Sequence, residues 1–157
     1  TIEYVSCTGC GDRTGLVVNG SPGALLFPMG VVRNTIIRHV GAGGITVPVI
    51  ETNMQSDLQF FENNVLYEPG AAATLYLDEG TTPLTTAAAI NLLGGAAANQ
   101  RFDCALTATW HIPLTAPNGG TGCRNTGTAT GAPDHDFDPN RRPLESGFDI
   151  GADEFVP

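Results

Sequence analysis

Three aspartates at alternate positions, Asp134, Asp136 and Asp138, group metal-ligating side chains near the end of the chain. Carboxylate oxygens with this spacing are typical ligands of a calcium-binding loop. The sixth position of an EF-hand loop is a glycine, whereas this chain has Pro139, so an EF-hand is excluded. Two interpretations remain: calcium bound by the three aspartates in another kind of loop, or aspartates that only form turns.

Four cysteines, Cys7, Cys10, Cys104 and Cys123, form an even set. Such a set is typical of structural disulfides in an oxidising compartment. Zinc is disfavoured because Cys7-x-x-Cys10 has no second pair of this kind. Of the three pairings, the simplest is local, Cys7 with Cys10 and Cys104 with Cys123. The second bond would close a loop of about 20 residues and contribute roughly 3 kcal/mol.

Length, charge and hydropathy limit the class of protein that can position these residues. With 157 residues, a single domain is expected. The formal charge of −9, with seven arginines and no lysine, excludes a nucleic-acid surface and docking on anionic lipid. No apolar run is long enough to span a membrane. Because the sequence does not begin with Met, we expect a mature product or a fragment of a longer chain.

Short apolar runs separated by turn residues indicate an all-β fold. Ile2, Ile36, Val65 and Ile90 begin similar segments at intervals of 34, 29 and 25 residues. A period of this size predicts a solenoid, specifically a right-handed parallel β-helix of about four coils. Asparagine near these positions fits one corner of each coil, because it accepts a left-handed backbone and its amide can bond the next coil. A β-sandwich with coincidental spacing is the alternative.

We expect residues 1–100 to form the coils. Residues 101–157 would add a final strand around Leu106–Ile112, a disulfide loop and a loop-rich C-terminal cap. In this cap, apolar side chains would cover the end of the last coil, and an arginine would pair with a tail carboxylate. The cap residues are Arg142 (or Arg141), Phe148, Asp149, Ile150, Asp153, Glu154 and Phe155. A disordered acidic tail is the alternative, but these aromatic and aliphatic residues are too apolar for it.

The tail resembles the ending of secreted bacterial right-handed parallel β-helix surface proteins. These include the choice-of-anchor Q type and relatives with polymorphic-outer-membrane-protein-like repeats. The matching residues are Asp136, Asp138, Arg142-Pro143 and the run Asp149-Ile150-Gly151-Ala152-Asp153-Glu154. The chain departs from that pattern at 115–120, where the family has a Ser-Pro-Ala-x-Asp-like segment. The resemblance implies an exported β-solenoid at the cell surface or outside the cell, and no particular activity.

These observations favour a non-catalytic extracellular structural or adhesive protein. The chain begins directly in a strand, so its first coil is expected to expose strand edges that pair with another chain. The partner would be a second copy, stacked head-to-tail into filaments, or preceding coils of a longer chain.

Two alternatives remain open. The first is a polysaccharide lyase or hydrolase, for which Arg33, Arg38 and Arg101 are the candidate bases. These arginines also fit surface charges, and His39 and His111 fit ordinary strand residues. The second is a calcium- or carbohydrate-binding module of a larger surface protein. Asn19 lies in a sequon for glycosylation. Besides calcium, no cofactor is expected.

Overall fold

The structure is a computed structural model that describes residues 2–5, 13–20, 30–40, 46–116 and 122–156. Its regular elements are short β-strands and one helical turn. They are β1 (Ile2–Val5), β2 (Arg13–Val18), β3 (Val31–Arg33), β4 (Ile36–Val40), β5 (Thr46–Glu51), β6 (Phe60–Glu62), β7 (Val65–Tyr67), β8 (Tyr76–Asp78), β9 (Thr82–Leu84), α1 (Ala87–Ile90), β10 (Ala96–Ala97) and β11 (Gln100–Arg101). Cys7 and Cys10 lie outside the described residues.

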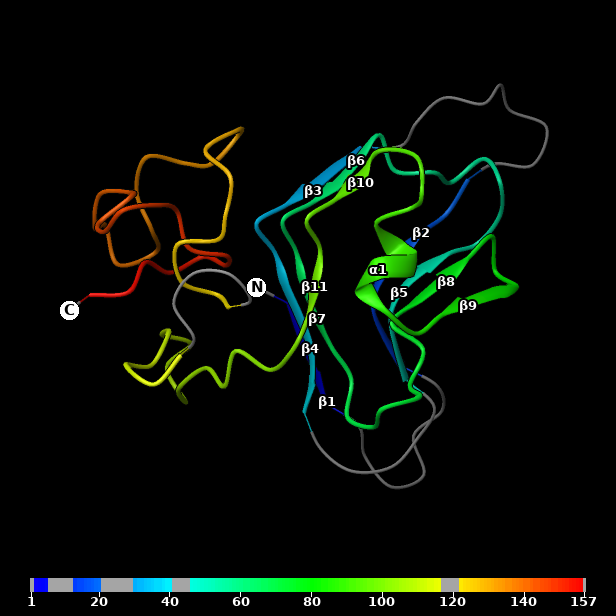
Figure 1. The fold of residues 1–157 in the computed structure, drawn as a ribbon, viewed down its shortest axis with the longest axis horizontal. Coiled ribbons are helices and arrows are strands. Elements are labelled where there is room, and N and C mark those ends of the chain that lie inside the picture. Colours follow the sequence, from blue (N-terminus) through cyan, green and yellow to red (C-terminus); the bar gives the residue numbers. More distant parts are fainter. Residues whose placement is uncertain (1, 6–12, 21–29, 41–45, 117–121, 157) are drawn as a thin grey trace.

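The strands form three stacked sheets that the chain visits repeatedly in the same order (Figure 1). The first sheet has the order β1-β4-β7-β11, the second β2-β5-β8-β9 and the third β3-β6-β10. Every pairing is parallel except that of β8 with β9. The chain thus makes three turns of a β-solenoid-like coil before β11. This confirms the predicted stacking of parallel strands, and the described strands do not form an antiparallel sandwich.

The register agrees with the predicted period at one step and departs from it at two. Ile36 pairs with Val65, as their spacing predicts. Ile2, however, pairs with Ile37. A shift of one residue turns a side chain to the opposite face of a sheet. Ile90 lies in α1, and β11 supplies the next strand of the first sheet.

The interior of the coils is apolar, and α1 covers it at the end of the third turn. Ile37, Leu66 and Tyr76 are almost completely buried there, together with Ile90 from α1. The Thr86 side chain caps α1 by accepting a hydrogen bond from the Ala89 N–H. Viewed along the coils, α1 lies in front of the space enclosed by the three sheets (Figure 1). The apolar end of the stack is therefore closed by this turn of helix.

Asparagines occupy the corner between the third and first sheets. Asn34 and Asn63 have positive φ angles of 48° and 52° there. Behind them, the Asn64 side-chain amide donates to Asn99 Oδ1 at 3.0 Å, and Asn64 Oδ1 accepts the Thr35 N–H at 3.0 Å. Both predicted properties of asparagine are thus found at this corner, but on different residues: Asn34 and Asn63 adopt the left-handed backbone, whereas Asn64 and Asn99 bond to the neighbouring turn in an asparagine ladder.

The predicted strand at Leu106–Ile112 is wrong. The segment forms a turn, in which Thr107 accepts from the Trp110 N–H and donates its own N–H to the His111 carbonyl. The Thr107 hydroxyl also accepts the His111 N–H at 3.0 Å. Such local side-chain hydrogen bonds compete with a strand ladder. Among the described residues of 102–156, an isolated antiparallel bridge joins His135 to Arg141, and no strand is formed.

The C-terminal region packs beside the coils instead of across their end. It forms a second apolar cluster with Ile36 and Val65, whose side chains lie outside the interior core. Ile150 and Phe155 are buried in this cluster. In Figure 1 the region, coloured yellow to red, lies beside the first sheet. The expected cap over the last coil is thus corrected to a lateral cover, because two turns present apolar residues on the outer face of that sheet.

The asparagine corner also anchors this lateral cover. The Asn34 carbonyl accepts the Gly151 N–H at 2.8 Å. The Asn34 side chain donates to the Thr128 carbonyl at 2.7 Å and accepts the Thr128 N–H at 2.8 Å. One turn further, Asn63 donates to the Thr126 carbonyl at 3.0 Å. Left-handed corner residues therefore direct their side chains outward to a segment more than 60 residues away.

Candidate functional site

His111, Asp138 and Asp153 bring three metal-ligating atoms within 4.8 Å of one another. His111 Nδ1 lies 3.4 Å from Asp138 Oδ2 and 3.4 Å from Asp153 Oδ1. Among the described residues, it is the one group of three or more His, Cys, Asp or Glu side chains whose ligand atoms lie close enough together to hold an ion. The side chains of His111 and Asp138 are 39% and 45% exposed, whereas that of Asp153 is 5% exposed.

Contacts outside the group hold each of its members in place. Asp153 Oδ2 accepts the Ile112 N–H at 2.7 Å, which leaves Oδ1 facing the imidazole. The His111 ring stacks on Phe137 with a centroid distance of 5.3 Å. The Phe137 N–H donates to the Ala152 carbonyl at 3.1 Å, which links the segment of Asp138 to that of Asp153. The three segments that form the cluster are therefore held to one another by contacts other than those among the three ligating atoms.

Burial raises the pKa of the Asp153 carboxyl, although the hydrogen bonds from Ile112 and His111 oppose this shift. A buried carboxylate beside a second carboxylate and one imidazole is a poorly solvated negative site. Such a site favours a proton or a cation.

Of the three aspartates predicted to bind metal, only Asp138 joins this cluster. Asp136 accepts hydrogen bonds from the Asp138 N–H, the Asn140 N–H and side chain, and the Glu154 N–H. Burial alone would raise the pKa of Asp136, but these hydrogen bonds together lower it. Asp134 is exposed, and its carboxylate lies 3.0 Å from His135 Nδ1. Asp136 thus follows the alternative interpretation of an aspartate that forms a turn.

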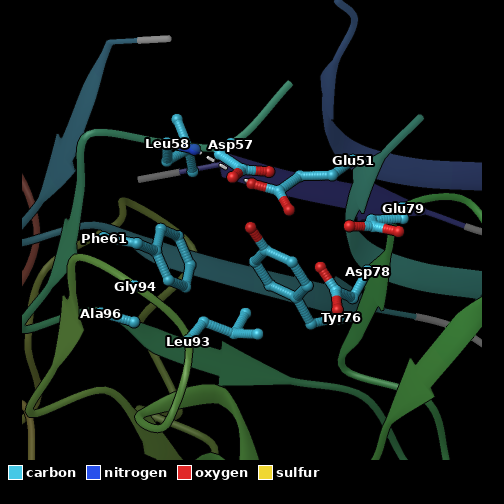
Figure 2. A pocket seen from close by; sticks show the side chains of 10 residues that line it. All are labelled: Glu51, Asp57, Leu58, Phe61, Tyr76, Asp78, Glu79, Leu93, Gly94 and Ala96. Atoms are coloured by element: carbon cyan, nitrogen blue, oxygen red, sulfur yellow. Dashed lines mark hydrogen bonds between the residues drawn. The ribbon is translucent and has the colours of Figure 1, made fainter. Parts of the chain in front are cut away.

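A hollow of about 160 Å³ lies between the second and third sheets (Figure 2). Glu51 and Asp78 line it, and Figure 2 shows the Tyr76 hydroxyl pointing to the Glu51 carboxylate. Burial raises the pKa of both Glu51 and Tyr76. Glu51 accepts hydrogen bonds from Tyr76 and from the Leu58 N–H and is only 3% exposed. The Glu51 carboxylate is therefore held by two hydrogen bonds at the wall of the hollow.

The candidate catalytic arginines are engaged in structural contacts. Arg33 Nε lies 2.6 Å from Glu62, and Arg38 lies 3.4 Å from Asp103. Arg101 donates to the carbonyl oxygens of Gly70, Ala71 and Thr85. His39 is buried with its Nδ1 2.8 Å from Glu68.

The predicted bond between Cys104 and Cys123 is confirmed, with the two Cα atoms 5.9 Å apart. Both residues are completely buried against the first sheet. The second predicted disulfide, between Cys7 and Cys10, lies outside the described residues. Asn19, the glycosylation candidate, is exposed, and its side-chain oxygen accepts the Thr52 hydroxyl at 2.7 Å.

The predicted tail residues form one buried network. Arg142 Nε pairs with Glu154 at 2.7 Å, and Arg142 also donates to the Asp149 carbonyl at 2.8 Å. The Asp149 carboxylate accepts the Asn125 N–H at 2.6 Å and the Phe155 N–H at 2.7 Å. Ile150 is completely buried next to this network. Of the two arginines considered for the pair, Arg142 is thus the one that reaches Glu154.

Sequence reasoning missed the His111 cluster because His111 was interpreted as an ordinary strand residue. Its partner Asp153 lies 42 positions away. One signal was available in the sequence. His111 lies between Cys104 and Cys123, and the disulfide between them holds this segment and the start of the C-terminal region on one side of the coils.

Comparison with protein-family models, with curated proteins and with solved structures gives no match for this chain. In the part of the chain that the structure describes, no helix has the length and apolar character needed to cross a membrane.

Proposed function

We propose that this chain is a non-catalytic extracellular β-solenoid with a structural or adhesive role. Residues 1–100 would form a right-handed parallel β-helix, and residues 101–157 would cover one of its sides. Three features support the proposal: the stacked parallel sheets, the buried disulfide and the resemblance of the tail to secreted β-helix surface proteins. Parallel crossovers are right-handed in about 98% of cases, and disulfides persist in oxidising compartments.

The absence of catalysis is supported by how the candidate groups are used. The three arginines considered as bases contact acidic side chains or backbone carbonyls. Glu51, the buried acid of the hollow, already accepts two hydrogen bonds. A general base must instead reach the proton that it abstracts. Release of products from pectin, alginate or a glycosaminoglycan, lost in Arg38→Ala, would contradict the proposal and favour a polysaccharide-active enzyme.

The observation that carries the structural role is the difference between the two ends of the stack. At one end, β1, β2 and β3 each pair with a single strand among the described residues. At the other end, α1 closes the interior, while β10 and β11 are the last strands of their sheets. Open strand edges pair with other chains unless they are protected. We infer that the β1–β2–β3 edge binds the β10–β11 edge of a second copy, which builds a head-to-tail filament.

Val17 in β2 allows this edge to be blocked selectively. The Val18 carbonyl accepts the Thr52 N–H at 3.1 Å, so the polar backbone groups of Val18 face the β5 side. In a parallel sheet, adjacent residues of a strand direct their N–H and carbonyl groups to opposite sides, so those of Val17 face the open edge. Val17→Pro would therefore remove an N–H from the open edge without removing one from the ladder with β5.

Negative-stain microscopy and sedimentation velocity test this proposal. We expect the unmodified chain to form head-to-tail particles at high concentration, and Val17→Pro to remain monomeric with an unchanged circular dichroism spectrum. Val17→Thr, which keeps the N–H, is the matched control and should assemble normally. A chain that stays monomeric at every concentration, or a Val17→Pro variant that still assembles, would contradict the filament.

A further inference from the structure

We propose that His111, Asp138 and Asp153 bind a divalent transition-metal cation, with Zn²⁺ as the representative ion. The ligand atoms would be His111 Nδ1 and one oxygen from each carboxylate, which lie within 4.8 Å of one another. This inference is independent of the proposed filament, because the cluster lies in the C-terminal cover and none of its three residues belongs to a strand. It also differs from the calcium site expected at Asp134, Asp136 and Asp138.

The spacing of the ligand atoms fits a small cation. Tetrahedral Zn²⁺ with bonds of about 2.0–2.1 Å holds its ligand atoms roughly 3.3 Å apart. The two contacts of His111 Nδ1 are each 3.4 Å. Both contacts exceed the usual N–H···O distance of about 2.7–3.2 Å, and the one to Asp153 is a long hydrogen bond. One imidazole lies equally far from both carboxylates, which is the arrangement expected around a shared ion.

The donor types select the class of metal. Imidazole nitrogen suits zinc, copper, iron and nickel, whereas calcium takes six to eight oxygen ligands. Three protein ligands also leave positions open for water or a further group. The part-exposed side chains of His111 and Asp138 give solvent access to the site, while Asp153 anchors it from the buried side.

The surrounding contacts preorganise the site. The bond from the Ile112 N–H to Asp153 Oδ2 fixes the carboxylate so that Oδ1 faces the imidazole. Stacking on Phe137 fixes the plane of the His111 ring. Hydrogen bonds that orient the ligands in this way normally raise metal affinity. A bound cation would also relieve the repulsion between the Asp138 and Asp153 carboxylates.

Titration of the chelator-treated chain with Zn²⁺, followed by calorimetry, and with Co²⁺, followed by visible absorption, tests the proposal. We expect one ion per chain at this site. His111→Ala and Asp138→Asn should each weaken binding by at least ~100-fold, more than loss of an outer hydrogen-bonding partner usually does. His135→Ala is the matched control, because His135 also lies beside an aspartate but faces one carboxylate only, and it should bind as the unmodified chain does.

Two further measurements keep the test decisive. Circular dichroism should show that both ligand variants stay folded, since the side chains of His111 and Asp138 are 39% and 45% exposed and neither residue lies in a strand. The Co²⁺ spectrum should show d–d bands of nitrogen and oxygen ligation without a thiolate charge-transfer band. No stoichiometric uptake, unchanged affinity in His111→Ala, or a thiolate band that places the ion on cysteine would overturn the proposal.

Discussion

Arg142 and Glu154 form an ion pair of 2.7 Å in which the two side chains are only 2% and 1% exposed. The same Glu154 oxygen accepts the Asp149 N–H at 3.1 Å, and Arg142 donates to the Asp149 carbonyl. The guanidinium also lies 5.8 Å from the centre of the Phe148 ring. A charge this deeply buried depends on its partner, because either group alone would lose its hydration without compensation.

Removing one partner of this pair should strongly destabilise the chain. Arg142→Ala or Glu154→Ala should each lower the free energy of unfolding by about 3–5 kcal/mol, since an uncompensated charge remains buried. Urea unfolding measures the loss. The neighbouring Arg141 is exposed, and Arg141→Ala should change the same quantity by less than about 0.5 kcal/mol. A double mutant whose loss equals the sum of the two single losses would show that the pair is not coupled.

Substitution of Asn99, at the centre of the asparagine ladder, should destabilise the folded chain. Asn99 Oδ1 accepts from both the backbone and the side chain of Asn64, and Asn99 Nδ2 donates to the Phe61 carbonyl at 2.7 Å. Asn99→Ala leaves these buried groups unpaired and should cost about 3 kcal/mol in chemical denaturation. The surface variant Asn19→Ala serves as a control and should remain within about 0.5 kcal/mol of the unmodified chain. Equal effects of both substitutions would argue against a structural ladder.

The bond between Cys104 and Cys123 should raise thermal stability. Replacing both cysteines by alanine removes a constraint worth roughly 3 kcal/mol in the unfolded chain, which corresponds to about 6–12 °C in Tm. Differential scanning calorimetry measures this shift, and peptide mapping without reductant checks the connectivity. Added reductant in the double variant then reports on the predicted Cys7–Cys10 bond alone. A reductant-insensitive melt of the unmodified chain would contradict the stabilising role.

Glu51 should make stability depend on pH. Burial raises the pKa of its carboxyl above the unfolded value, so the folded chain holds the proton more tightly. The stability from the neutral acid is complete below the unfolded pKa and is lost as the pH rises through the folded pKa. Glu51→Gln should therefore raise Tm at pH 7, by roughly 2–4 °C if ~1 kcal/mol is recovered, and leave it unchanged near ~pH 3.5.

Thermal melts of both proteins across this pH range isolate Glu51, because the other titrating groups are common to both. An equal Tm difference at low and neutral pH would mean that packing, and not ionisation, separates Glu51→Gln from the unmodified chain. A variant that is less stable at pH 7 would show that the hydrogen bonds to Leu58 and Tyr76 outweigh the cost of burying the charge.

Much of the architecture followed from local patterns. Short apolar runs at a repeating interval predicted stacked parallel strands, and the pairing of Ile36 with Val65 has the predicted spacing. Asparagine beside these runs predicted the corner ladder, since its backbone and amide chemistry suit that position wherever it recurs. The pairing of Cys104 with Cys123 also followed from residue type and proximity in the sequence. The sequence likewise predicted an ion pair between a tail arginine and a tail carboxylate, and the structure selects Arg142 and Glu154 among the candidates.

The tertiary structure alone decided where these parts meet. Isoleucine is common in strands, yet Ile90 closes the interior as part of α1, because the third turn leaves an apolar end uncovered. Ile36 and Val65 face away from that interior, so the tail packs on the side of the stack. This lateral packing brings His111 within 3.4 Å of Asp138 and of Asp153. The sequence shows which side chains can bind an ion. Whether those side chains meet in space depends on which face each strand turns outward, and a register shift of one residue reverses that face.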